Sequence, residues 1–420
     1  MNILFLHQNM PGQFGHLAAH LARAPDHRVV FLTKTASAAP DGVTHVVYGP
    51  KRRGQPSTHH YLHGFEAAVL HGQAVARALL QLQRRGFTPE LIVAHPGWGE
   101  PMFIKDALPQ TKLVNYCEFF YRAAGADVGF DPSETVDVDT RARLRTRNAA
   151  LMIALEACDQ GIAATNWQRS VHPPEFHDKI EVVFDGVDAD RVCPDPASSF
   201  CLPDGRMLGP GDQVVTYVAR NLEPYRGFPS FMRALPRILE ALPAAQIVIA
   251  GGDEVSYGQP APGGETWRQA MLREVALPDG ERDRVHFVGT LAYGDYVRLL
   301  QVSSAHVYLT YPFVLSWSAM EALAAGCLVI GSRTPPVEEV IRDGDNGMLV
   351  DFFAPSAIAD AVIEAVRRGG GNAALRRRAR ETVLGRYDLT TCLQRQLALL
   401  ERVTGRSLAV GERRLSGRAA

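Results

Sequence analysis

A chain of 420 residues exceeds the size at which one hydrophobic core keeps growing, so we expect two domains. Hydrophobic residues at 46% and charged residues at 21% are typical of a globular protein with enough apolar material for two cores. The 44 Lys and Arg residues balance the 45 Asp and Glu residues, which argues against a nucleic-acid partner and makes any phosphate binding local.

The cysteines and the N-terminus bear on location. The six cysteines are scattered without a C-x-x-C pair, which favours reduced thiols over a disulfide or zinc framework. The N-terminal sequence MNILFLHQNMPG has no basic segment, and its apolar run is too short for a signal or transmembrane helix. We therefore expect a cytoplasmic protein.

The first half of the chain alternates short apolar runs with longer helical segments, which is typical of parallel strands joined by crossover helices. The expected strands are NILFLH, HRVVFLT, THVVYG, ELIVAH, KLVNYCE, QGIAAT and IEVVF. Between the third and fourth runs, apolar residues from Phe65 to Leu82 fall at roughly helical spacing. We predict that residues 1–192 form the first domain.

After Val192 the sequence CPDPASSFCLPDGRMLGPGD is dense in Pro, Gly, Ser and Asp, which predicts a linker over residues 193–212. The alternation then restarts and predicts a second domain over residues 213–390, followed by a C-terminal helix and tail over 391–420. The expected strands are QVVTYVA, AQIVIAG, RVHFVG, AHVYLT, LVIGS and GMLVD, with helices near 228–241, 266–276, 293–302 and 317–325.

This order of elements sets the expected fold class. It is α/β, with two Rossmann-like, doubly wound parallel-sheet domains that face each other across a cleft. Ligands of such folds bind outside the carboxyl ends of the strands, so residues that directly follow the predicted strands are the candidates for the site.

The loop HQNMPGQFGHLAAHLA follows the first strand. Pro11, Gly12 and Gly15 make it tight and small, which suits the close approach of a phosphate or a sugar to the helix that follows. On its own a G-x-x-G pattern is a weak signal.

Two further strands of the first half end in ionisable residues, His95 and Glu118. His95 is followed by Gly97 and Trp98, which could form a sugar-stacking platform, but a single His after an apolar run is as often structural. Glu118 could bind a substrate hydroxyl, act as a base if its pKa were raised, or pair with Arg122.

Histidines and arginines gather in two other places. His59 and His63 have helical spacing, but apart from Glu66 no further ligand stands at a convincing distance, so we expect no metal. The runs DTRARLRTRNAAL and LRRRAR could contact an anionic lipid, although solvated helix faces are the simpler interpretation.

In the second half, the sequence YVARNLEPYRGFPSF follows the first strand. Arg220 and Arg226 stand six residues apart at the carboxyl end of that strand, with Pro224 to shape the loop and Gly227 to allow close approach. Fixed cations at this place could stabilise the charge of a departing nucleoside diphosphate. The alternative is a surface loop with two solvated arginines.

The stretch YPFVLSWSAMEALAAGCLVIGS carries one ionisable residue, Glu321. Ser316 stands at a helix start, where the unpaired N–H groups of the first turn would bind an anion. Glu321 lies just over one turn further on among apolar residues. We expect it to face a ligand or a hydrogen-bonding group, or otherwise to reach water or pair with an arginine.

The run AMEALAAGCLVIGS, followed by VEEVIRDGDNGMLVD, resembles the nucleotide-sugar motif of the retaining glycosyltransferases of family 4, which have the GT-B fold. The resemblance covers nearly the whole chain. It implies that Glu321 holds the ribose of the donor, that Arg220 and Arg226 clamp the diphosphate, and that the Gly12–Gly15 loop closes over the donor. The family usually has Lys where this sequence has Arg226.

The family motif is a Glu-x7-Glu pair, and its first Glu is replaced here by Phe313. Because TYPFVLSWS resembles a recurrent variant of the family, we interpret Phe313 as a subgroup feature. The Ser316 side chain and the backbone N–H groups of Val314, Leu315 and Ser316 could take over part of the role of the missing carboxylate.

The resemblance implies a metal-independent enzyme without a cofactor that transfers a sugar, with retention of configuration, from a nucleoside diphosphate sugar to a hydroxyl of a glycan, lipid or small molecule. In the favoured front-face mechanism the leaving phosphate takes the acceptor proton. Family members often have His at the position of Glu118. A peripheral contact with the inner face of the membrane stays open, as do two alternatives: an epimerase of nucleotide sugars with the same fold and a non-catalytic nucleotide-sugar-binding protein.

Overall fold

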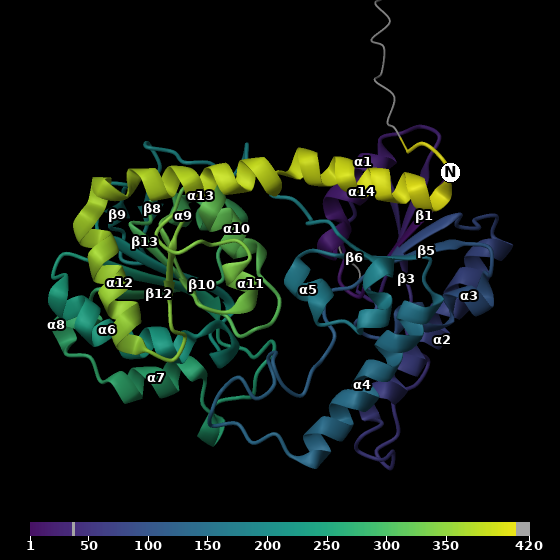
Figure 1. Ribbon diagram of the computed structural model, residues 1–420, viewed down its shortest axis with the longest axis horizontal. Helices are drawn as coiled ribbons and strands as arrows, with labels where there is room; N and C mark the ends of the chain where they lie inside the picture. Colours follow the sequence, from purple (N-terminus) through teal and green to yellow (C-terminus); the bar gives the residue numbers. More distant parts are fainter. Residues whose placement is uncertain (36–37, 409–420) are drawn as a thin grey trace, which may run out of the picture. The chain divides into compact units, whose positions relative to one another are not determined.

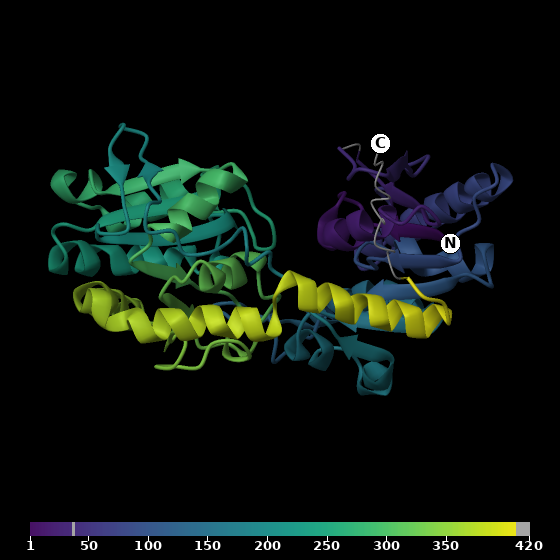
Figure 2. The same ribbon diagram turned by 90° about the horizontal axis from the view of Figure 1, so that it is seen from above.

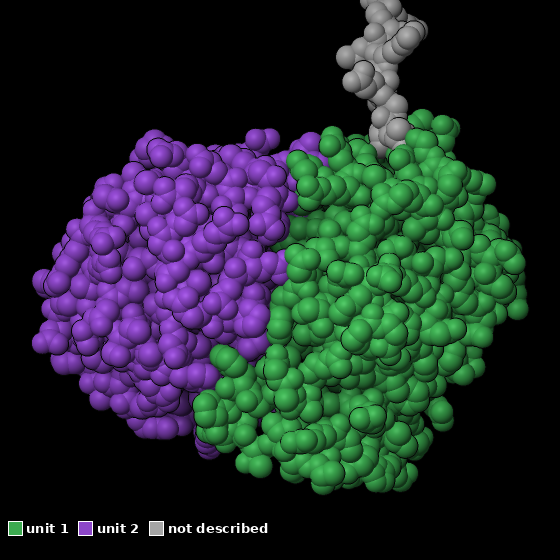
Figure 3. Space-filling model, in the orientation of Figure 1, with its two compact units in different colours: residues 1–185, 391–420 green, residues 186–390 purple. Residues whose placement is uncertain are grey.

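The chain forms two compact units in the computed structural model, which describes residues 1–35 and 38–408. Unit 1 comprises residues 1–185 together with the C-terminal segment that begins at Thr391, and unit 2 comprises residues 186–390 (Figure 3). The first unit therefore ends earlier than the expected boundary at residue 192. The described part of the C-terminal segment joins unit 1, whereas residues 409–420 of the expected tail lie outside the described residues.

Unit 1 is built on a parallel sheet with the strand order β3-β2-β1-β4-β5-β6-β7 among its described residues. Figure 1 labels β1, β3, β5 and β6 of this sheet. Its strands are β1 (Asn2–Leu6), β2 (Arg28–Thr33), β3 (Val43–Val47), β4 (Leu91–Ala94), β5 (Lys112–Tyr116), β6 (Gln160–Ala163) and β7 (Ile180–Val182). Its helices are α1 (Gly15–Ala22), α2 (His63–Arg84), α3 (Ile104–Ala107), α4 (Val138–Ala157), α5 (Asn166–Ser170) and α14 (Leu389–Thr404), with short 3-10 turns η1 (Gly12–Phe14), η2 (Glu100–Phe103) and η3 (Pro174–Lys179).

The central strands β1 and β4 of unit 1 are apolar and buried almost throughout, because both faces of the sheet are covered there. On one face Leu4 and Leu6 pack with Val75 and Leu79 of α2. On the other face the ring of Phe5 lies 5.7 Å from that of Phe14, at the start of α1. The parallel register aligns the carboxyl ends of β1, β4 and β5 along one edge.

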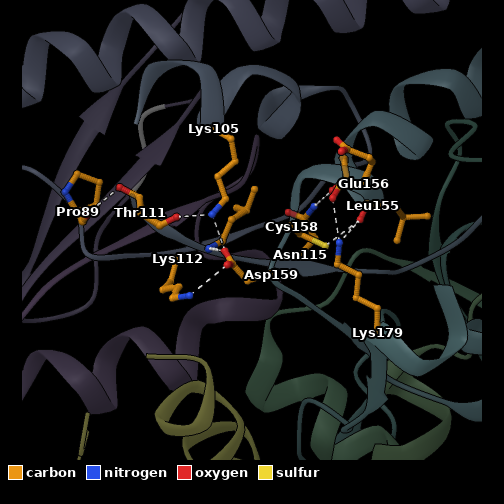
Figure 4. Close-up of polar contacts among 12 residues, drawn as sticks. Pro89, Lys105, Thr111, Lys112, Asn115, Leu155, Glu156, Cys158, Asp159 and Lys179 are labelled. Atoms are coloured by element: carbon orange, nitrogen blue, oxygen red, sulfur yellow. Dashed lines mark hydrogen bonds and ion pairs between the residues drawn. The ribbon is translucent and has the colours of Figure 1, made fainter. Parts of the chain in front are cut away.

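A charged cluster fixes the opposite, amino-terminal edge of the same sheet (Figure 4). Asp159 directly precedes β6 and pairs with Lys105 at 2.7 Å and with Lys112 at 3.4 Å, while it accepts the backbone N–H of Leu113 at 2.8 Å. Lys179 donates to the last carbonyl groups of α4. These contacts join β5, β6 and their neighbouring helices, so we assign this cluster a structural role.

Unit 2 contains a second parallel sheet, with the order β12-β11-β10-β13-β14-β15 among its described residues. Its strands are β8 (Phe200–Cys201), β9 (Met207–Leu208), β10 (Val214–Asn221), β11 (Gln246–Gly252), β12 (Val285–Gly289), β13 (Ala305–Tyr308), β14 (Val329–Ser332) and β15 (Met348–Val350). Its helices are α6 (Phe228–Ala241), α7 (Trp267–Val275), α8 (Asp279–Arg282), α9 (Tyr293–Gln301), α10 (Trp317–Ala324), α11 (Pro335–Glu338), α12 (Pro355–Arg368) and α13 (Ala373–Arg386), with the 3-10 turns η4 (Pro224–Arg226), η5 (Pro262–Gly264) and η6 (Gly369–Asn372).

Helices cover both faces of this sheet as well. Helices α6 and α12 pack against each other on one face (Figures 1 and 2), where Tyr217 of β10 stacks on Phe231 of α6 at 5.1 Å. On the other face Val214 and Val248 pack with Leu299 of α9. Strand order and helix placement confirm the expected fold class of two Rossmann-like parallel-sheet domains.

Residues 193–212, which we expected to form a linker, belong to unit 2. They contain the antiparallel hairpin β8–β9, in which Phe200 pairs with Leu208. Both side chains are buried in the same core as Val214 and Leu299. The Pro- and Gly-rich composition thus reflects the turns of this hairpin.

Candidate functional site

A cavity of about 680 Å³ opens in unit 2 where β10, β11, β12 and β13 end. The strand order reverses between β10 and β13, so the cavity lies at the switch point of the sheet. Its wall is formed by Val218, Ala219, Arg220, Asn221, Glu223, Arg226, Ala250, Gly251, Glu254, Tyr257, Gly289, Thr290, Leu291, Tyr293, Tyr296, Tyr308, Ser316, Trp317, Ser318 and Glu321.

Glu321 of α10 lies in this wall and is held by two tyrosines of α9. The hydroxyl of Tyr293 donates to Oε1 at 2.7 Å, and that of Tyr296 donates to Oε2 at 2.8 Å. Burial raises the pKa of Glu321, and the two tyrosines and Arg191 offset only part of that effect. The partners are thus tyrosines rather than the arginine that we considered, and each carboxylate oxygen keeps acceptor capacity for a ligand hydroxyl.

Arg226 of η4 contributes a firmly placed cation. Its Nη1 donates to the Tyr308 hydroxyl at 3.2 Å, to the Thr310 hydroxyl at 2.7 Å and to the carbonyl of Val314 at 3.0 Å. The guanidinium also lies 5.5 Å from the ring centre of Tyr257. These contacts fix the charge in the cavity wall, because the guanidinium stays protonated.

Arg220 lines the same cavity from the end of β10, but its side chain is exposed and has no ion-pair partner among the described residues. The structure therefore brings both predicted arginines to one cavity and gives them different surroundings.

Ser316 occupies the N-cap position of α10, but its side chain does not cap the helix. Its hydroxyl bonds to that of Ser318 at 2.7 Å, and its N–H donates to Tyr308 at 2.9 Å. The expectation that the N–H of Ser316 contacts a ligand therefore needs correction, since this group already has a partner. Val314 and Leu315 lie outside the cavity wall, and the carbonyl of Val314 accepts a hydrogen bond from Arg226.

Phe313, which replaces the first Glu of the motif, is buried in an aromatic cluster. Its ring centre lies 5.1 Å from that of Tyr257 and 5.7 Å from that of Tyr225, while Tyr225 stacks on Tyr311 at 4.6 Å. Phe313 does not reach the cavity wall, so its ring supports the wall from behind.

A second group of predicted residues meets at the carboxyl edge of the unit 1 sheet. Glu118 accepts a hydrogen bond from Gln13 Nε2 at 2.8 Å and contacts His95 Nε2 at 3.2 Å. The N–H of Gly97 donates to Nδ1 of His95 at 3.1 Å, which places the proton of the neutral imidazole on Nε2, facing Glu118. The ring of Trp98 lies 4.9 Å from that of His95.

The surroundings of Glu118 set its charge. Burial raises its pKa, but the contacts with His95, His7 and Gln13 outweigh this effect and lower the pKa below the usual range. The condition that we set for Glu118 to act as a base, a raised pKa, is therefore not met, and an ionised acceptor of hydrogen bonds is the better description. Arg122 is not its partner, because Nε of Arg122 donates to the carbonyl of Val171 at 2.7 Å.

His7 completes this cluster and was overlooked in the sequence. Its ring lies 4.9 Å from that of His95, and burial, followed by the nearby His95, lowers its pKa to about 3. A Cβ added to Gly12, whose φ is +50°, would lie 2.8 Å from Cδ2 of His7, so only glycine fits there. Gly15 begins α1 beside Pro11. The signal for His7 was its place directly after β1, which matches that of His95 after β4.

The other candidates have structural partners. His63 contacts the carbonyl of Thr58 at 2.6 Å, and the part of the chain that the structure describes gathers no group of three His, Cys, Asp or Glu side chains suited to a metal. In the run LRRRAR, Arg376 and Arg380 donate to backbone carbonyls, and Arg377 and Arg378 form ion pairs, so each of these arginines has a partner within the protein. Over residues 1–35 and 38–408, no helix is both long and apolar enough to cross a membrane.

Two sequence families match the chain. Residues 25–192 match the family described as Glycosyl transferase family 4 group, and residues 207–382 match the family described as Glycosyl transferases group 1.

Curated relatives align over part of their length. A GDP-mannose-dependent alpha-(1-6)-phosphatidylinositol monomannoside mannosyltransferase of Mycobacterium tuberculosis is 30% identical over 199 residues, which cover 44% of this chain and 46% of the relative. A D-inositol 3-phosphate glycosyltransferase of Corynebacterium glutamicum is 26% identical over 212 residues, or 48% of each chain. The chain thus spans about half the length of the curated relatives it matches.

Solved structures are similar over nearly the whole chain. Sucrose-phosphate synthase from Thermosynechococcus elongatus has a TM-score of 0.71 at 16% identity, covering 96% of this chain and 99% of that one. HepE from Anabaena in complex with UDP and glucose has a TM-score of 0.65 at 17% identity, covering 96% and 100%. At such identities the likeness shows the fold. From the two family matches and this fold, the chain belongs to the glycosyltransferase family 4 group and has the GT-B fold.

Proposed function

We propose that the chain is a retaining, metal-independent glycosyltransferase that moves a sugar from a nucleoside diphosphate sugar to a hydroxyl group of a glycan, lipid or small molecule. The observation that carries this proposal is the unit 2 cavity, whose wall combines two arginines with a carboxylate held by two tyrosines. This pairing suits a donor with an anionic diphosphate and a ribose that offers hydroxyl groups.

The arginines would serve the leaving group. When the bond between the anomeric carbon and the diphosphate oxygen breaks, negative charge grows on the diphosphate, and fixed cations stabilise it. Arg226 is held in place by three acceptors and needs little reorganisation, whereas the exposed Arg220 can close on the phosphates after binding. The acceptor oxygen forms the new bond on the same face, and its proton passes to the departing phosphate.

Glu321 would bind the ribose. Its carboxylate cannot turn away from the cavity without losing the hydrogen bonds from Tyr293 and Tyr296. A carboxylate accepts two hydroxyl groups of a ribose well, and hydrogen bonds with a charged partner are about twice as strong as neutral ones.

In unit 1 we propose that Glu118 accepts a hydrogen bond from a substrate hydroxyl. The His95 proton and the Gln13 amide hold the carboxylate, whose side chain is 31% exposed and so accessible to a ligand. With the leaving phosphate as the base, an ionised Glu118 orients the hydroxyl and need not remove its proton.

The names of relatives guide the choice of donor and acceptor. The mycobacterial relative is described as GDP-mannose-dependent and as acting on a phosphatidylinositol monomannoside, and HepE was solved with UDP and glucose. We therefore propose a UDP- or GDP-activated hexose as the donor and include lipid-linked acceptors, with peripheral membrane contact if the acceptor is a lipid. These relatives are transferases by name and lend no support to an epimerase.

The test is the release of nucleotide from UDP-, GDP- and ADP-sugars by the purified protein, with thermal stability followed on the same samples. Slow hydrolysis of one donor, with stabilisation by its nucleotide, is the expected result. An epimerase would instead convert the sugar without releasing nucleotide. Stabilisation without release, even with a panel of acceptors, would indicate a binding protein, and no response to any nucleotide would refute the donor site.

A further inference from the structure

Glu223 is a second carboxylate in the wall of the unit 2 cavity. It stands between β10 and η4 and is 1% exposed. Its Oε2 accepts hydrogen bonds from the backbone N–H groups of Ser256, Tyr257 and Gly258 at 3.2, 3.1 and 3.0 Å. Its Oε1 is buried and has no hydrogen-bond partner among the described residues.

The two oxygens of this side chain therefore have different roles. Three N–H groups on one oxygen fix the orientation of the carboxylate. The second oxygen is costly to leave bare, because buried polar atoms in folded proteins are almost always satisfied by the protein, by water or by a ligand. A carboxylate in the wall of a binding cavity is well placed to have its free oxygen satisfied by a ligand.

The chemistry of a carboxylate limits what it can bind. It repels a diphosphate and accepts hydrogen bonds only, so its partner must be a donor group such as a hydroxyl. The ribose hydroxyls are already assigned to Glu321, which is held by residues of α9. The hydroxyls of the transferred sugar remain, and Phe313 cannot bind them because it lies behind the wall.

We propose that Oε1 of Glu223 accepts a hydrogen bond from a hydroxyl group of the donor sugar. The carboxylate that the motif lacks at position 313 would then be supplied from the loop after β10. This inference rests on the proposed function, since it assumes a nucleotide-sugar donor in the unit 2 cavity.

The neighbours of Glu223 favour a sugar at this place. The loop that it anchors carries Tyr257, whose ring also lines the cavity and could stack on a sugar. Asn221 donates to the hydroxyl of Ser256 at 2.8 Å and holds the same loop from a second side. The guanidinium of Arg226 lies near Tyr257, which puts the sugar position beside the diphosphate position.

The variant Glu223→Gln separates the two roles. Its amide oxygen can still accept hydrogen bonds from the N–H groups of residues 256–258, while its NH2 group takes the place of Oε1 and cannot accept a hydrogen bond from a hydroxyl group. The affinities of UDP, UDP-glucose, GDP and GDP-mannose are measured by calorimetry. We expect the preferred nucleotide sugar to bind about 10- to 100-fold more weakly to the variant, as for a lost hydrogen bond to a charged group, and its nucleoside diphosphate to bind as to the wild type. Glu240→Gln, an exposed residue of α6, controls for the change of charge.

Monodeoxy analogues of the same donor give a second readout on the wild type, which holds even if the variant folds poorly. Removal of one hydroxyl should weaken binding to the wild type by a similar factor and have little effect on Glu223→Gln. If Glu223→Gln weakened the binding of the nucleotide and of the nucleotide sugar equally, the proposal would be overturned and Glu223 would be only an anchor of the loop. The same conclusion would follow if the wild type bound every deoxy donor as tightly as the complete donor. In both cases the proposed function would stand, whereas a wild type that binds no nucleotide or nucleotide sugar would refute the proposed function itself.

Discussion

Replacing Arg226 by alanine removes a cation that we place at the leaving group. The side chain is held by Tyr308, Thr310 and the carbonyl of Val314, so its charge is positioned before the reaction starts. Removing one such preorganised group costs about 3 kcal/mol of transition-state stabilisation. Because each 1.36 kcal/mol corresponds to a factor of about ten, we expect turnover to fall by roughly 100-fold.

The assay is nucleotide release with saturating donor, so that weaker donor binding does not enter the rate. Arg226→Lys is the matched variant: it keeps a positive charge but loses the planar fork, and its turnover should lie between those of the wild type and Arg226→Ala. Phe313→Ala should lower turnover far less than Arg226→Ala, since its ring supports the wall without lining it. Loss of a buried aromatic side chain typically costs about 3–5 kcal/mol of folding stability. The turnover of Phe313→Ala is therefore measured below the melting temperature of this variant, so that unfolding does not lower the rate.

Wild-type turnover in Arg226→Ala, in a protein that melts like the wild type, would refute the assignment of Arg226 to the leaving group. Equal losses in Arg226→Ala and Phe313→Ala would instead indicate that both act through the shape of the cavity.

Three more predictions concern other residues. Gly12→Ala should lower the free energy of unfolding by about 1–3 kcal/mol in urea denaturation, because the added Cβ would meet His7 at a positive φ, while the roomier Gly15→Ala should cost less. Glu321→Gln should weaken nucleoside diphosphate binding about tenfold or more in calorimetry, and unchanged affinity would exclude Glu321 from the ribose site. Glu118 has a lowered pKa, so its contribution to stability is present above its usual value of 4.5 and is lost as the pH falls through the lower folded value. The stability difference between wild type and Glu118→Gln should therefore narrow below pH 4.5, and a constant difference would contradict the pairing of Glu118 with His95.

The parallel sheets could be predicted because their strands are short apolar runs separated by helical spacing. The helices expected near 228–241 and 293–302 are α6 and α9 to within a residue. The error at residues 193–212 arose because turn residues dominate both linkers and short hairpins. The burial of Phe200 and Leu208, which distinguishes the two, depends on tertiary packing.

The candidate site was predictable where a charge stands at a strand end or in an apolar run, as with Arg226 and Glu321. Its partners were not, because they come from distant parts of the chain: Tyr293 is 28 residues from Glu321, and Gln13 is 105 residues from Glu118. Glu223 gave no signal in the sequence, since an acidic residue in a loop is ordinary until its burial is known.

Helix α14 returns the chain to unit 1 after the whole of unit 2. Gln396 donates to the carbonyl of Phe184 at 3.1 Å, and Arg402 pairs with Glu181, so this helix is bonded to the segment where the chain first leaves unit 1. During synthesis on the ribosome, residues 1–185 must therefore wait for residues 186–390 to emerge before their last helix arrives. Unit 2 is one continuous segment and can fold as soon as it has been synthesised. A nascent chain arrested near Thr390 would instead contain a unit 1 that lacks its C-terminal helix and would need protection by chaperones.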